Sequence, residues 1–105
     1  MPKYITFFSY TGDAAKAMIQ HPSDRVAAAK ALVESVGGSL DCMYFAFGDT
    51  DVYGICDVPD AASATALSLV INSSGAVTIN LTPLMTPEDV DAAAAKTPAY
   101  RAPGA

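Results

Sequence analysis

The sequence predicts an α+β fold. Four short segments rich in β-branched and aromatic residues alternate with helical stretches, and a short Gly/Asp turn joins the two middle strand segments. The chain has 105 residues, which is the size of a single domain. Right-handed crossovers in two β-α-β halves turn this element order into a ferredoxin-like βαββαβ sandwich with an extra C-terminal helix. We therefore expect residues 1–105 to form one domain, with 97–105 as a loose tail.

The first half of the chain is expected to contain one strand and a helical stretch in two parts. Residues 3–10 are strand-like, and Thr11 is placed to cap the helix that follows. His21 precedes a proline, which disfavours the helical conformation and breaks the stretch. The helix restarts after Ser23-Asp24 and ends at Gly37-Gly38. Four apolar residues of this second part share one helical face: Val26, Ala29, Val33 and Val36.

The second half is expected to contain three strands and two helices. Residues 39–47 and 52–58 form an antiparallel hairpin, because strong strand signals flank a short turn. Asp60 can cap a helix that runs to about residue 74. Residues 77–82 alternate as a fourth strand, expected to end before the proline that follows. Thr86 caps a last helix that has a proline and acidic residues in its first turn.

The composition excludes several classes of function. The net charge is -5 and the six Lys and Arg residues are scattered, which argues against nucleic-acid binding. The mean hydropathy of +0.28 is high, yet no apolar run approaches the ~20 residues of a membrane span. The N-terminal residues show no secretory pattern, so we expect a cytoplasmic protein without membrane contact. Two cysteines do not make a disulfide scaffold.

Large apolar groups on both sides of the sheet indicate self-association. On the first strand Tyr4 and Phe8 oppose Ile5 and Phe7. The second strand is apolar on both sides as well, with Leu40, Cys42 and Tyr44 expected on one face and Met43 and Phe45 on the other. A solvated second face would expose a larger apolar patch than monomers carry. We therefore expect two sheets to pack face to face in a homodimer, or in a higher oligomer.

Four stretches of the chain resemble one family of small proteins. These stretches are "MPKYITFFSYTGDAAKAM", "HPSDRVAAAKALVESVGG", "YFAFGDTDVYGICDVPDAASATALSL" and "SSGAVTINLTPLM". Together they resemble the GYD-domain family, which belongs to the dimeric α+β-barrel superfamily. Gly48 and Asp51 match the hairpin motif Gly-x-Tyr-Asp of the family, whereas Thr50 stands where tyrosine is usual. The resemblance implies a ferredoxin-like fold and dimerisation, and it implies no established activity or catalytic residues.

The hairpin turn contains two carboxylates, Asp49 and Asp51. Aspartate favours such turns because its side chain bonds nearby backbone amides, so a turn-forming role is the simpler interpretation. The alternative is that Asp51, at the start of a strand, projects towards a pocket as a base or polar anchor. A metal site is not expected, because one histidine with scattered acids has no recognisable ligand spacing.

Three residues are candidates for catalysis: His21, Asp51 and Tyr53. His21 supplies the only imidazole of the chain and lies at a helix break, where loops often line a pocket mouth. As a general base it would need an orienting acid, such as Asp24 or Asp51. A surface linker histidine is the simpler interpretation of that position.

Four further residues are candidates for ligand binding: Tyr10, Tyr44, Gly54 and Asn80. Aromatic side chains, hydroxyls and an amide around an apolar cavity would hold a small, mostly apolar molecule. The aromatic residues can equally fill a dimer core. Gly54 in mid-strand indicates a bulge or the close approach of another backbone or a ligand. Cys42 and Cys56 would face each other in one hairpin register and separate in a register shifted by one residue.

Three functions remain open from the sequence. The leading one is binding of a small molecule between the sheet and the helices of a homodimer. The second is cofactor-independent enzymatic chemistry, of an oxygenase or isomerase type, on an aromatic or dicarbonyl compound. The third is a structural or assembly module without a ligand. No cofactor is expected in any of them, and fold alone does not choose between them.

Overall fold

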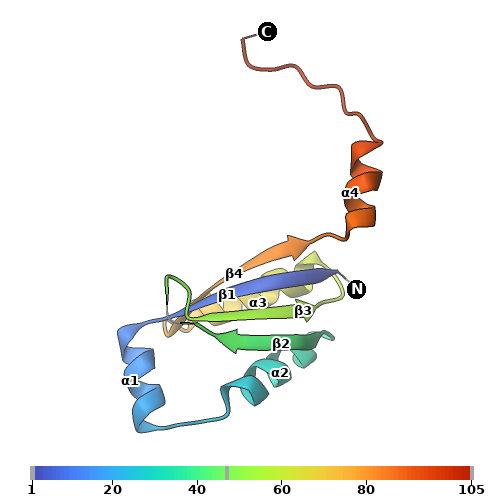
Figure 1. The fold of residues 1–105 in the computed structure, drawn as a ribbon. Helices are drawn as coiled ribbons and strands as arrows, with labels where there is room; N and C mark the ends of the chain where they lie inside the picture. Colours follow the sequence, from blue (N-terminus) through green and yellow to red (C-terminus); the bar gives the residue numbers. More distant parts are fainter. Residues whose placement is uncertain (1, 47, 105) are drawn as a thin grey trace.

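The computed structural model describes residues 2–46 and 48–104 and confirms the α+β, ferredoxin-like architecture. Figure 1 shows one sheet with helices on one side and a C-terminal arm. The elements in chain order are β1 (Lys3–Tyr10), α1 (Gly12–Gln20), α2 (Arg25–Ser35), β2 (Ser39–Phe45), β3 (Val52–Asp57), α3 (Ala61–Ser73), β4 (Val77–Leu84) and α4 (Pro87–Ala94). The antiparallel sheet has the order β2-β3-β1-β4, as expected for two interleaved β-α-β units.

The helices cover a single face of the sheet. Helix α2 packs along β2 and α3 packs along β4, so the two helices lie over opposite halves of the sheet (Figure 1). Helix α1 projects from the end of β1 and contains no buried residue. We call the side under α2 and α3 the helical face and the other side the open face. The core on the helical face consists of Tyr4, Val33, Cys56, Val58, Ala64 and Leu67.

Each helix begins at a residue whose side chain satisfies a free backbone N–H of the first turn. The predicted caps are confirmed: the Thr11 hydroxyl accepts from Ala14 N–H at 3.1 Å, and Asp60 accepts from Ser63 N–H at 2.8 Å. This hydrogen bond lowers the pKa of the Asp60 carboxyl. Thr86 and Asp89 form a reciprocal capping box at α4.

A β-bulge at Asp41 corrects the predicted alternation of β2. Leu40 pairs with Cys56 and Cys42 pairs with Ile55, so Asp41 is an extra residue without a partner on β3. The extra residue moves Leu40 to the helical face, whereas Cys42 stays on the open face. The hairpin register itself is the shifted alternative, in which Cys42 lies opposite Ile55 and not opposite Cys56, and both cysteines are free thiols.

Two further expectations about the elements were wrong. Strand β4 continues through Pro83 to Leu84, because β4 is an edge strand and the missing N–H of a proline is tolerated there. Val26 does not belong to the core face of α2 and is 44% exposed. Arg25, one residue earlier, occupies that face instead. Phe47, predicted at the end of the second strand, lies outside the described residues.

The C-terminal arm lies apart from the sandwich. Every residue from 82 to 104 is exposed, and Figure 1 shows α4 and the segment after it extending away beyond the end of β4. The radius of gyration is 17.1 Å, compared with about 13 Å for a compact chain of this length. The arm and the projecting helix α1 both extend the chain beyond the two packed layers.

Candidate functional site

An apolar cavity of about 290 Å³ lies between the sheet and helices α2 and α3. Its floor is the helical face of the sheet, including Thr6, Phe8, Gly54, Cys56, Ile79 and Leu81. Its roof comes from the two helices, including Ala28, Ala29, Leu32, Val33, Leu67 and Ile71. The cavity thus lies between two layers of secondary structure and is lined mainly by apolar atoms. Its volume is at the lower end of the range typical of small-molecule pockets.

Gly54 forms the centre of the cavity floor. It pairs with Thr6 on β1 and with Met43 on β2. A Cβ atom at Gly54 would stand 2.9 Å from the Thr6 hydroxyl oxygen and 3.3 Å from the Cys42 carbonyl oxygen. The strands therefore approach each other too closely for a larger residue. Without a side chain of its own, Gly54 contributes only backbone atoms to the lining of the cavity.

Two polar groups of the cavity floor, the Thr6 hydroxyl and the Cys56 thiol, have low reactivity. The buried Thr6 hydroxyl donates to the Gly54 carbonyl oxygen at 3.1 Å, so its only proton is already used. Burial raises the pKa of the Cys56 thiol, and the Asp57 and Asp41 carboxylates add to the effect. A neutral, buried thiol behaves as a small apolar group and is a poor nucleophile. Neither group gives the floor a reactive centre.

The end of the cavity near α1 has polar residues. Tyr10, Arg25 and Val77 line the cavity and also line an adjoining outer groove, which His21 borders from the helix break. The structure therefore brings His21, Tyr10 and Arg25 to one end of the molecule. Arg25 was missed by the sequence analysis. Helical periodicity could have identified Arg25, because it lies three, four and seven residues before Ala28, Ala29 and Leu32 and so shares their face of the helix.

Asp51 makes backbone contacts that join the hairpin to β1. Its carboxylate accepts from Tyr10 N–H at 2.8 Å, and its own N–H donates to the Phe8 carbonyl oxygen at 2.9 Å. Its carbonyl oxygen accepts from Ala46 N–H at 2.8 Å. These bonds fix the end of the hairpin beside Tyr10. The residue also borders a shallow groove between α1 and the hairpin, and it is half-buried.

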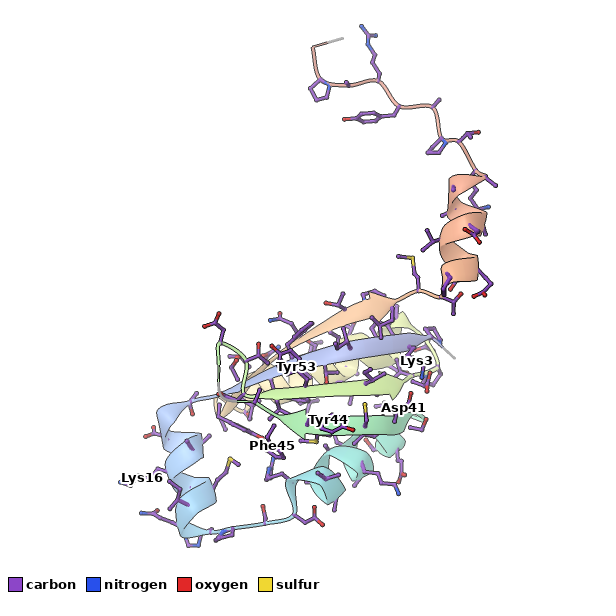
Figure 2. The ribbon with its side chains drawn as sticks, viewed as in Figure 1. Lys3, Lys16, Asp41, Tyr44, Phe45 and Tyr53 are labelled. Atoms are coloured by element: carbon purple, nitrogen blue, oxygen red, sulfur yellow. The ribbon has the colours of Figure 1, made fainter. Side chains whose placement is uncertain are left out.

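Tyr44, Tyr53 and Asn80 lie on the open face, away from the cavity. Tyr44 and Tyr53 are paired across β2 and β3, and Figure 2 shows them next to each other. The Tyr53 ring meets Phe7 edge to face at 5.5 Å. Asn80 pairs with Phe7 on the edge strand β4. Of the three catalytic candidates, Tyr53 therefore lies on the face of the sheet opposite the groove that His21 borders.

A charged cluster occupies one end of the open face. Lys3 contacts the carboxylates of both Asp41 and Asp57, and its Nζ lies 3.0 Å from Asp57. Figure 2 shows Lys3 and Asp41 at this end. The hydrogen bond from Lys3 lowers the pKa of Asp41, and the Asp41 contact is the main cause of a raised Lys3 pKa. The bulge at Asp41 makes this cluster possible by adding a carboxylate beside the Lys3–Asp57 pair.

The described part of the chain contains no cluster of three or more His, Cys, Asp or Glu side chains that could hold a metal ion. Within residues 2–46 and 48–104, no helix combines the length and hydropathy of a bilayer-spanning segment.

The fold and cavity define a small α+β protein of the ferredoxin-like type with an apolar hollow between its layers. The model of the GYD domain matches residues 4–94, which is most of the chain, so the protein belongs to the GYD domain family. The match includes all four strands and α4. The same comparisons found no matching curated protein and no matching solved structure.

We predict that Asp51→Ala lowers the free energy of unfolding by about 1–3 kcal/mol, because the Tyr10 N–H loses a charged acceptor. Urea unfolding monitored by circular dichroism measures the change. Asp51→Asn keeps an acceptor and should recover most of the loss. Asp49→Ala, two residues earlier on the exposed turn, should stay within about 0.5 kcal/mol of the wild type. Equal stability of Asp51→Ala and Asp49→Ala would contradict the structural role of Asp51.

Proposed function

We propose that this GYD-domain protein binds a small, mostly apolar molecule in the cavity between its sheet and helices α2 and α3, and that it does so as a homodimer. The cavity is the observation that carries the proposal. A space of about 290 Å³ between two layers of secondary structure departs from the close packing normal for a protein interior. The Gly54 floor and the small alanines of α2 leave that space unfilled. An apolar ligand would restore the missing contacts.

An enzymatic role has weaker support in this geometry. A general base needs an orienting partner within hydrogen-bond reach. Both bonds that Asp51 makes to β1, through its carboxylate and its N–H, go to backbone groups, and Tyr53 lies on the opposite face of the sheet. The Cys56 thiol is held neutral by burial. The cavity thus offers a shape and an apolar surface but no converging catalytic pair, which favours binding over chemistry.

The homodimer is supported by the residues of the open face. The sheet residues Ile5, Phe7 and Ile55 are only half-buried, and helices α2 and α3 lie over the other face of the sheet (Figure 1). Tyr44 is 71% exposed and Tyr53 39% exposed beside them. These residues form the apolar centre of the open face, and the Lys3 cluster lies at one end of it. A protein interface has the same arrangement of an apolar core and a polar rim. In a two-fold dimer, the same face of a second chain would cover these residues.

Filling the cavity should abolish ligand binding without unfolding the protein. Ala29→Leu places three additional carbons into apolar space, so stability should be unchanged or raised, at about 0.8 kcal/mol per buried CH₂. Octan-1-ol is a suitable neutral probe, titrated into ¹⁵N-labelled protein and followed by amide chemical shifts. We expect saturable shifts at cavity residues in the wild type and at least a tenfold loss of affinity in Ala29→Leu.

Ala31→Leu is the matched control, because Ala31 is exposed on the same helix and does not line the cavity. It should bind octan-1-ol as the wild type does. The binding proposal fails if octan-1-ol produces no saturable shifts at the cavity in the wild type. It fails equally if Ala29→Leu and Ala31→Leu bind the probe alike.

The dimer should have twice the 10.8 kDa chain mass in light scattering at micromolar concentration. Tyr44→Lys should shift it towards the monomer mass, because an unpaired charge would be buried against the second sheet. Tyr44 is largely exposed in the single chain, so the substitution should leave the fold intact. Ala62→Lys, on the exposed side of α3, should remain dimeric. A monomeric wild type would refute the dimer.

A further inference from the structure

Arg25 brings a positive charge to the mouth of an apolar cavity. It is the first residue of α2, on the face that Ala28, Ala29 and Leu32 direct towards the sheet. It lines both the cavity and the outer groove, so it lies where the two spaces meet. A cation in the first helical turn faces the positive end of the helix dipole, which is an unfavourable place for it. Helix formation therefore does not account for an arginine at this position.

The guanidinium group has an unmet hydrogen-bonding requirement. Its Nε atom is buried and has no hydrogen-bond partner among the described residues. A buried N–H without an acceptor costs free energy, so hydrogen bonds within the fold do not account for an arginine here either.

Among residues 2–46 and 48–81, both ion pairs found within 4 Å belong to Lys3. Two carboxylates of this region already bond backbone groups. Asp24 accepts from Ala27 N–H at 3.0 Å, and Asp51 accepts from Tyr10 N–H at 2.8 Å. Neither Asp24 nor Asp51 forms an ion pair with Arg25.

The two polar side chains of the cavity floor, Thr6 and Cys56, are poor binding groups for an anion. The Thr6 hydroxyl donates its hydrogen bond to the Gly54 carbonyl oxygen, and burial keeps the Cys56 thiol neutral. Tyr10 brings a phenol to the same end as Arg25. The polarity of the site is therefore concentrated at one end, with hydrocarbon along the remainder. A molecule that fits this pattern has an apolar body and one acidic end.

We propose that the ligand of this cavity is an apolar carboxylic acid, whose hydrocarbon or aromatic body fills the cavity and whose carboxylate is held by Arg25. The inference rests on the proposed binding function and adds the class of ligand. A guanidinium group matches a carboxylate with two parallel hydrogen bonds. The volume of about 290 Å³ equals that of roughly ten water molecules at about 30 Å³ each. The acid is therefore small, of the size of octanoate or phenylacetate.

The test compares octanoate, octan-1-ol and octylamine, which share one hydrocarbon chain and differ in charge. Each is titrated into the full-length wild type by calorimetry and by amide chemical shifts at pH 7. We expect octanoate to bind at least tenfold more tightly than octan-1-ol, and octylamine to bind more weakly than octan-1-ol. Arg25→Met removes the charge but keeps the apolar stem of the side chain. It should lower octanoate affinity at least tenfold and leave octan-1-ol affinity within about twofold.

Lys30→Met is the matched control, because Lys30 is an exposed cation of the same helix that does not line the cavity. It should bind octanoate as the wild type does. Arg25→Lys should recover only part of the affinity, because an ammonium group cannot form the two-point contact. The ligand class is refuted if the wild type binds octanoate no better than octan-1-ol, or if Lys30→Met loses as much affinity as Arg25→Met. If octan-1-ol still binds at the cavity, the proposed binding function stands even though the ligand class is refuted. If none of the three probes binds, both the binding function and the ligand class are refuted.

Discussion

Gly54 lies opposite Thr6 near the middle of the sheet, where the Cβ atom of any other residue would collide with the Thr6 hydroxyl and approach the Cys42 carbonyl. The Thr6 side chain and the Cys42 backbone leave no room for a side chain at this position. Because the position faces the helices, the forbidden side chain leaves a hollow under α2 and α3. The small residues Ala28 and Ala29 do not fill it from above. Small residues in both layers thus border the apolar cavity.

The one-sided helical layer connects the cavity with the proposed dimer. Helices α2 and α3 cover the helical face and create an internal space, while the open face keeps its own apolar residues. A dimer through the open face would bury Tyr44 and Tyr53 and leave the cavity mouth near Arg25 at the opposite side of the sheet. Binding and association then use different faces. Each subunit would carry its own site, and neither site would need residues from the partner.

Local signals in the sequence were sufficient to predict the fold. Thr11, Asp60 and Thr86 cap helices where their side chains reach a free N–H, and the order of elements then determines the sheet. The bulge at Asp41 could not be predicted, because an extra residue in a strand leaves no local pattern. It reverses the expected face of Leu40, whereas the register of the hairpin itself separates the cysteines by placing Cys42 opposite Ile55.

The candidate site was predictable only in part. Gly54 was recognised because a glycine in mid-strand is costly without a reason, and the structure places it in the cavity floor. Tyr53 is its neighbour on the same strand, so strand alternation alone directs it to the other face. Arg25 was missed because helical periodicity was counted from apolar residues, which favoured Val26. The actual core face begins one residue earlier and includes a charge.

Xenon binding tests the existence of the apolar cavity most directly, because xenon enters dry apolar cavities without needing any polar contact. Amide spectra of the ¹⁵N-labelled protein, recorded under increasing xenon pressure, report where the gas binds. A saturable response concentrated at Gly54, Leu32 and Ile79, and lost in Ala29→Leu, is the result predicted for a hollow under α2 and α3. Weak, unsaturable shifts spread evenly over the chain would show that the two layers close on each other in solution, and the cavity would then be refuted.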